Sequence, residues 1–222
     1  MAHDLIDSTE MYLRTVLEHE EEGIPPLRAR LSERLGLSAP SISEGVARLE
    51  SQGLMRLAAD RTVQLTAEGR ERAEHVMRKH RLAERLLVDV LGLEHEYVHA
   101  EACRWEHVIS DRVEARLVEF LGNPTTSPYG NPIPGSGGGF EDVISLAEVE
   151  DGPVVLHSIS EHLQADAEVM HLLHAHGPIA GARGEVARGS GSFTLHLAGH
   201  PIELPPDAAR FVYVRRLEPA TQ

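Results

Sequence analysis

The sequence predicts a mainly α-helical chain with β structure: an N-terminal winged helix-turn-helix, a helical middle part and a small C-terminal β domain. Three observations support this prediction. Helix-like apolar stripes separated by glycines occupy residues 1–121, Pro and Gly crowd residues 123–139, and strand-like alternation follows. The 222 residues are 41% hydrophobic and 25% charged, which is ordinary for a folded protein of two or three domains. We place the domains at 1–74, 75–140 and 141–222.

The first two elements are helices, and the first is predicted to end near Gly23. Its apolar stripe consists of Leu5, Ile6, Met11, Tyr12, Val16 and Leu17. A short second helix at 27–35 is closed by Gly36. Ser38 then offers an N-cap and Pro40 fits the first turn of a third helix.

The third helix, residues 40–52, stops at Gly53, and two short strands at 54–57 and 62–65 follow as a hairpin. This order is typical of a winged helix-turn-helix, whose second helix enters the major groove of DNA. The residues at the start of that helix are small or polar enough to approach base edges: Ser38, Pro40, Ser41, Ser43 and Glu44. The flanking residues that could contact phosphates are Arg28, Arg30, Arg48 and Arg61. A winged helix used only for protein contacts is the alternative.

The charge distribution confines DNA binding to this region. The whole chain carries a net charge of −14, which would repel phosphate. Residues 26–72, however, hold eight Arg and six acidic residues, so this stretch is locally basic while the flanking regions are acidic.

The middle part continues as helices. Thr66 can cap a long helix that reaches Leu91, and helices at 94–109 and 111–121 follow. Residues 123–139 are predicted to form a linker, stiff where Pro is frequent and flexible where Gly is frequent.

The C-terminal part is mostly β. Its predicted strands are 154–159, 184–188, 193–197 and 211–217. A helix at 165–176 interrupts them, and we expect its His171, His174 and His176 to be solvated.

Potential metal ligands lie on one face of the helix predicted at 94–109. They are His99, Cys103, Glu106 and His107. A thiolate, a carboxylate and imidazoles suit a transition metal, and they differ from the closed Cys-rich sets of structural zinc. His80 and Glu84 form a second pair one turn apart, and Met11 can offer a thioether. Taken singly, such a Met is usually core and such a His–Glu pair is usually a surface pair.

Several classes are disfavoured. The single cysteine, Cys103, cannot form an internal disulfide. Because the chain lacks a long apolar run and a signal-peptide pattern at its start, we expect a cytoplasmic protein without membrane contact.

The chain resembles the diphtheria toxin repressor family of iron-dependent regulators, especially the actinobacterial ones. The matching motifs are Thr9–Thr15, Pro26–Arg30, Met77–Leu87, Ala100–His107 and Asn123–Pro128. The resemblance continues more weakly through the β domain, which it identifies as SH3-like. It implies a non-enzymatic, iron(II)-dependent repressor of iron-uptake and iron-homeostasis genes.

The resemblance also implies two metal sites per subunit. The primary site carries over to Met11, Cys103, Glu106 and His107. The ancillary site carries over to His80, Glu84, His99, Glu161 and Gln164. The metal implied is Fe²⁺, and Co²⁺, Ni²⁺, Mn²⁺ or Zn²⁺ can substitute in vitro.

The partners implied are a second copy of the chain and double-stranded palindromic operator DNA, which can hold one dimer or two. The helices of residues 75–121 would dimerise through Val113, Leu117, Val118 and Leu121. Glu44 departs from the Gln usual in the family, and Ser51 from a common Arg, which puts base preference and one phosphate contact in question.

Three other functions remain open: a manganese-responsive regulator of the same fold, a metalloenzyme with an open metal, and a metal-buffering protein. A comparison of Mn²⁺ with Fe²⁺, an activity assay and a DNA-binding assay would distinguish them.

Overall fold

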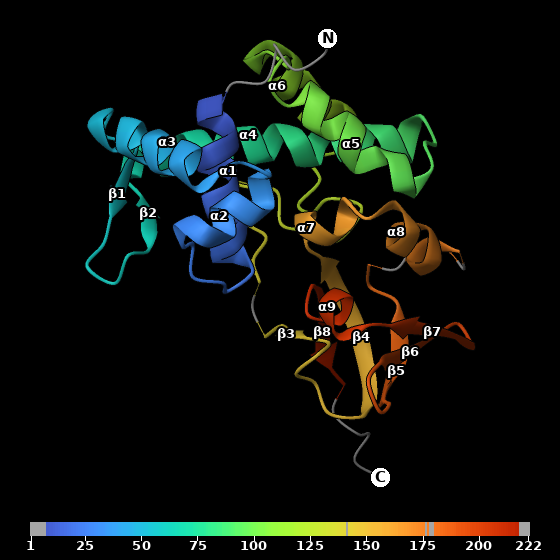
Figure 1. Ribbon diagram of the computed structural model, residues 1–222. Helices are drawn as coiled ribbons and strands as arrows, with labels where there is room; N and C mark the ends of the chain where they lie inside the picture. The colour runs from blue at the N-terminus through green and yellow to red at the C-terminus, as the bar shows by residue number, and fades with distance from the viewer. Residues whose placement is uncertain (1–7, 141, 176, 178–179, 218–222) are drawn as a thin grey trace. The chain divides into compact units, whose positions relative to one another are not determined.

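The computed structural model describes residues 8–140, 142–175, 177 and 180–217 (Figure 1). The chain divides into two compact units. Unit 1 contains the described residues up to His80 together with Cys103–Glu114. Unit 2 contains Arg81–Ala102 and the chain from Ala115 onward.

Unit 1 contains the predicted winged helix-turn-helix. Its elements are α1 (Ser8–Glu21), α2 (Arg28–Leu35), α3 (Ala39–Ser51), β1 (Met55–Leu57), β2 (Val63–Leu65) and the first part of α4 (Ala67–Arg85). The local signals act as predicted: Gly36 ends α2 with a φ of 65°, and the Ser38 hydroxyl accepts from the backbone N–H of Ser41 at 3.3 Å. Thr66 likewise accepts from the Gly69 N–H at 3.0 Å and caps α4.

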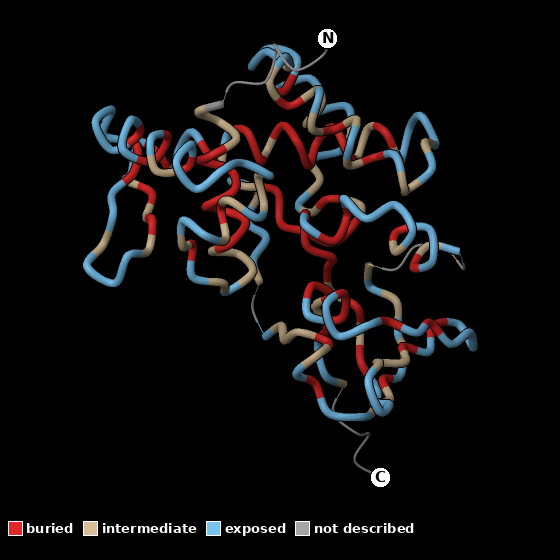
Figure 2. The backbone as a smooth tube through the Cα atoms, viewed as in Figure 1, coloured by how far each residue is buried: buried red, intermediate tan, exposed pale blue. Residues whose placement is uncertain are grey.

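The wing is a two-stranded antiparallel hairpin in which Met55 pairs with Leu65 and Leu57 with Val63. Its turn includes Arg61, whose φ of 67° is left-handed. Figure 2 shows this turn as an exposed loop.

The core of unit 1 joins α1 to the helix-turn-helix. Its buried apolar residues include Leu13, Val16, Leu17, Leu31, Ile42, Val46, Leu49, Leu54, Met55 and Val63. A Cβ at Gly45 would lie 2.4 Å from the Tyr12 hydroxyl oxygen, so only glycine lets α1 and α3 approach this closely. The Tyr12 hydroxyl also donates to the Ser41 carbonyl at 3.1 Å. The position of α3 therefore depends on the position of α1.

The long helix predicted to reach Leu91 contains two geometries. α4 ends at Arg85, and a π-helical turn, η1 (Leu86–Val90), follows. Beyond it, α5 spans His95–Trp105 and α6 spans Asp111–Phe120.

The sheet of unit 2 is antiparallel, with the order β3-β8-β4-β5-β6-β7. Its strands are β3 (Ile144–Ser145), β4 (Gly152–Ile159), β5 (Arg183–Arg188), β6 (Phe193–Leu197), β7 (His200–Leu204) and β8 (Val212–Arg216). Helices α7 (Glu161–Gln164), α8 (Ala167–His174) and α9 (Pro206–Ala209) connect them. This is the predicted C-terminal β domain, but β3 and β7 were not predicted because they are short or begin next to proline.

The prediction of a linker at 123–139 is wrong for its central part. Ser127 and Tyr129 are 0% exposed, and Asn131 and Ile133 are 2% and 1% exposed. Asn131 donates to the Ile159 carbonyl at 2.7 Å, and the Ile159 N–H donates to the Tyr129 carbonyl at 3.0 Å. Composition alone could not show that these polar groups have partners far along the chain.

His174 also differs from expectation. Its ring stacks on that of His95 with a centroid separation of 3.7 Å, and both rings meet Tyr129 edge to face. Burial and the neighbouring His95 lower the pKa of His174 to about 4. His171 is exposed as expected, and His176 lies outside the described residues.

Within the described part of the chain, none of the helices combines the length and the apolar character needed to cross a bilayer.

Candidate metal and DNA sites

Three predicted primary ligands lie at the C-terminal end of α5, within unit 1. Cys103 is in the last turn of the helix, which ends at Trp105. Glu106 and His107 therefore lie in the turn that follows the helix. The helix predicted from the sequence at 94–109 had included both residues. The turn is closed by the Ile109 N–H, which donates to the Trp105 carbonyl at 3.0 Å.

Glu106 is the buried anion of this group. It is 1% exposed, and its two carboxylate oxygens each accept from Arg14 Nη1 at 2.7 Å. His80 Nδ1 lies 2.6 Å from Oε2, and His107 Nε2 lies 3.1 Å from Oε1. Burial alone would raise the pKa of Glu106, but the charges of Arg14 and His80 outweigh it and hold this pKa far below the ordinary value. Glu106 is therefore ionised throughout the physiological range.

His107 lies between two carboxylates. Its Nδ1 is 2.5 Å from Glu10 Oε2 on α1, and its Nε2 faces Glu106. Burial opposes the charged imidazolium, but the hydrogen bonds to Glu10 and Glu106 raise the pKa of His107 to about 9.

Arg14 on α1 contacts two of these ligands, Cys103 and Glu106. The sequence alone had assigned no role to it. Besides Glu106, its Nη1 donates to Cys103 Sγ at 3.3 Å. The signal that could have found it is its position three residues after Met11, on the same face of α1. Met11 is half-buried and lies between Glu10 and Arg14, which both contact the predicted ligands.

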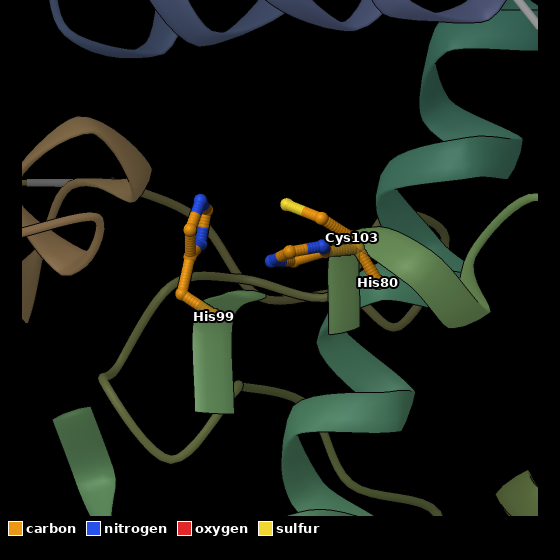
Figure 3. A group of neighbouring side chains, drawn as sticks. All are labelled: His80, His99 and Cys103. Carbon is orange, nitrogen blue, oxygen red and sulfur yellow. The ribbon is translucent and has the colours of Figure 1, made fainter. Parts of the chain in front are cut away.

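His80 also contacts residues outside the ancillary site to which the resemblance assigns it. It is 0% exposed, contacts Glu106 and lies beside Cys103, with ligand atoms within 4.8 Å of one another. Figure 3 shows the His80 ring and the Cys103 thiol close together, with His99 one turn before Cys103 on α5. In unit 1, His80 therefore lies beside Cys103 and Glu106, two of the predicted primary ligands.

The predicted ancillary ligands in unit 2 lie together. The ligand atoms of Glu84, His99 and Glu161 are within 4.8 Å of one another, and His99 Nδ1 is 3.7 Å from Glu161 Oε2. The other oxygen of Glu161 accepts from Arg81 Nε at 2.9 Å. The remaining predicted ligand, His80, precedes Glu84 by one turn of α4.

Gln164 fits this set through an unsatisfied oxygen. It is 1% exposed and its Nε2 donates to the Ile159 carbonyl at 2.9 Å, which fixes the amide. Its Oε1 is buried and accepts no hydrogen bond from the residues that the structure describes. A buried carbonyl-type oxygen without a donor is suited to a cation.

A third cluster, which the sequence did not suggest, joins α4 and α6 in unit 1. His75, Asp111 and Glu114 have ligand atoms within 4.8 Å of one another. Lys79 lies 3.1 Å from Asp111 and Arg78 lies 2.7 Å from Glu114, so these carboxylates already have cationic partners.

The predicted DNA-contacting residues lie on the exposed side of the helix-turn-helix. Ser38, Pro40, Ser41 and Glu44 are exposed at the start of α3, as are Arg28, Arg48 and Arg61 around it. Ser43 and Arg30 are half-buried: Ser43 donates to the Ala39 carbonyl at 2.9 Å and Arg30 to the Pro25 carbonyl at 2.7 Å. Ser51 donates to the Arg48 carbonyl at 2.6 Å.

Known proteins match the chain along nearly its whole length. Residues 4–63 match the N-terminal DNA binding domain of iron dependent repressors, and residues 66–135 match their metal binding and dimerisation domain. The iron-dependent repressor IdeR of Mycobacterium tuberculosis (strain ATCC 25618 / H37Rv) is 48% identical, covering 97% of this chain and 100% of the relative. The diphtheria toxin repressor of Corynebacterium diphtheriae is 46% identical, covering 96% and 99%.

Solved structures agree with the fold. A manganese-dependent transcriptional repressor in complex with manganese has a TM-score of 0.83 at 32% identity, covering 94% of this chain and all of its own. The IdeR of T. acidophilum has a TM-score of 0.76 at 26% identity, covering 93% and 96%.

Proposed function

The chain belongs to the family of iron-dependent repressors, and from this premise we propose that it is an iron(II)-activated repressor of iron-uptake and iron-homeostasis genes. The chain is not a metalloenzyme, since the relatives that it matches are transcriptional repressors. The proposed cellular location is the cytoplasm, where the operator DNA lies.

The primary metal ligands we propose are Met11, Cys103, Glu106 and His107. One observation carries the assignment: the residues that flank Met11 on α1 already contact the other three ligands. Glu10 contacts His107, and Arg14 contacts both Cys103 and Glu106. The donors are two sulfurs, a carboxylate and an imidazole, a set that suits Fe²⁺ and the later divalent metals.

These ligands can couple metal binding to DNA binding because they lie on two elements, α1 and the end of α5. Bound there, a divalent ion would supply one positive centre shared by α1 and the end of α5. Since a ligand shifts a conformational equilibrium only through its different affinity for the two states, metal favours the arrangement in which Met11 reaches the α5 ligands. α1 in turn positions α3 through the close packing of Tyr12 on Gly45.

For the ancillary site we propose Glu84, His99, Glu161 and Gln164, with His80 as the further ligand that the family implies. The unsatisfied Oε1 of Gln164 supports this proposal. His80 precedes Glu84 by one turn of α4 and also contacts Glu106. Because these donors are mostly oxygen, Mn²⁺ is a reasonable occupant here, and a manganese-responsive repressor is the alternative function.

We propose that a homodimer binds double-stranded palindromic operator DNA, as one dimer or two, through the start of α3 and the flanking arginines. Val113 and Phe120 on α6 are 49% and 68% exposed, which supports α6 as a dimerisation face.

The test is a gel-shift titration with Fe²⁺ or Co²⁺ on the Met11→Ala/His107→Ala double variant. Removing one ligand from each element should abolish metal-dependent DNA binding. The matched control is His196→Ala on the exposed side of β6, which should behave like the wild type. Operator binding by the double variant without metal would contradict the proposal. Activation at lower Mn²⁺ than Fe²⁺ under anaerobic conditions would favour the manganese alternative.

Metal affinity should rise with pH until about pH 9, because His107, whose pKa is raised to about 9, must lose its proton to bind metal. The same raised pKa stabilises the folded protein below the ordinary histidine pKa, and this contribution disappears as the pH rises through about 9. NMR titration of the imidazole would measure this pKa directly. Glu10→Gln should lower the pKa of His107, and an ordinary histidine pKa in the wild type would refute the prediction.

A further inference from the structure

Arg14 is held inside the proposed primary site. Arg14 is 4% exposed. One of its nitrogens, Nη1, donates to both Glu106 carboxylate oxygens at 2.7 Å and to Cys103 Sγ at 3.3 Å. A guanidinium is always charged and presents a planar fork of donors. Arg14 therefore places a permanent positive charge against two of the four proposed metal ligands.

A metal ion would need the same atoms. Metal–sulfur and metal–oxygen bonds of about 2.0–2.3 Å place the ion among the donor atoms that Nη1 now contacts. The guanidinium and the ion would then be like charges in contact within a buried site, which is strongly unfavourable. We propose that Arg14 competes with the metal for Cys103 and Glu106, and that its displacement sets the metal concentration at which the repressor is activated.

Arg14 has a second partner, Glu18, with which it can stay paired after a metal ion displaces it from Cys103 and Glu106. Its Nε donates to Glu18 Oε1 at 2.7 Å, one turn further along α1. The other oxygen of Glu18 accepts from Arg34 of α2 at 3.2 Å, and Arg34 also pairs with Glu22 at 2.7 Å. The guanidinium can therefore turn toward Glu18 without losing every charge partner, and it would do so next to the first helix of the helix-turn-helix.

This inference rests on the proposed function, because it requires that Cys103 and Glu106 bind metal. Arg14 would then be a residue that lowers the affinity for metal. A residue that merely supports the ligands would raise metal affinity, so the two roles predict opposite results on removal of Arg14.

The experiment measures Co²⁺ binding to the full-length protein by the absorption of the Cys103–Co²⁺ bond, in competition with a chelator. Arg14→Leu, which offers no metal ligand, should lower the Kd by about tenfold or more, since hydrogen bonds to a charged group no longer have to be broken. Without metal, Arg14→Leu should have a lower Tm than the wild type, and Co²⁺ should raise its Tm by more. If this variant does not fold, Arg14→Lys, which cannot bridge all the same acceptors, should show a smaller decrease in Kd.

Arg70→Leu is the control, because it removes an arginine of unit 1 that pairs with Glu20 on α1 and lies outside the network of Arg14 and Glu18. Its Kd for Co²⁺ should stay that of the wild type. An unchanged or higher Kd in Arg14→Leu, or in Arg14→Lys if that is the variant that folds, overturns the inference. If the wild type shows no Co²⁺ absorption that Cys103→Ser removes, the proposed primary site itself is wrong.

Discussion

Replacing Glu106 by glutamine is expected to abolish metal-activated DNA binding and to lower the free energy of unfolding by about 3–5 kcal/mol, the cost of breaking a buried ion pair. Arg14, His80 and His107 all direct nitrogens at this carboxylate, at distances between 2.6 and 3.1 Å. The amide of glutamine carries no charge, and one of its two ends is a donor that would face these donors. The variant therefore removes a metal ligand and leaves Arg14 with a weaker partner.

Chemical denaturation without metal measures the stability, and a gel shift with Co²⁺ measures DNA binding. The control is Glu68→Gln on α4, whose side chain is 58% exposed and pairs with Arg72. Such an exposed pair contributes about 0–1 kcal/mol, so the control should be nearly neutral in both assays. A Glu106→Gln protein that is as stable as the wild type and still binds operator with Co²⁺ would show that this carboxylate has neither role.

Replacing Arg81 by methionine is expected to lower the free energy of unfolding by a similar amount, about 3–5 kcal/mol. The Arg81 and Glu161 side chains are 1% and 2% exposed, and their atoms are 2.9 Å apart. Arg81 also donates to the Pro132 carbonyl, so it ties α4 to α7 and to the buried segment 127–133 within unit 2. Methionine fills much of the volume but removes the guanidinium that pairs with the buried Glu161 carboxyl group.

The Arg81→Met variant also tests the proposed ancillary metal site. Because Glu161 is one of the proposed ligands, Mn²⁺ or Co²⁺ should recover more stability in Arg81→Met than in the wild type. Arg216→Met is the control, since Arg216 on β8 is 52% exposed and pairs with Glu150, which is 80% exposed. It should cost about 1 kcal/mol or less. Equal losses in Arg81→Met and Arg216→Met would show that the buried pair contributes no more than an exposed one.

The helix-turn-helix could be predicted well because its signals are local. Gly36, Ser38 and Thr66 act on backbone groups within a few residues of themselves, and the structure has them in the predicted roles. Helical spacing likewise placed His99 and Cys103 one turn apart on α5. The end of that helix was less predictable, and Glu106 and His107 fall beyond it.

Residues 127–133 show where composition misleads. Their two prolines and one glycine are typical of a linker, yet Tyr129 and Ile133 are buried and Asn131 is hydrogen-bonded to Ile159. The stacking of His174 on His95 is a similar case, since no local pattern tells that a histidine on a short helix has a ring partner on another element.

The sequence by itself determined the kind of fold, the basic DNA-reading segment and the types of ligand offered to a metal. Those properties depend on residue type, local spacing and local charge. Only the tertiary structure decided what charge each ligand meets: Arg14 reaches Cys103 across 89 positions of sequence, and Arg81 reaches Glu161 across 80. The physical reason is that burial makes an ionic group depend on whichever opposite charge the fold brings within hydrogen-bonding distance, and no local pattern encodes that distance.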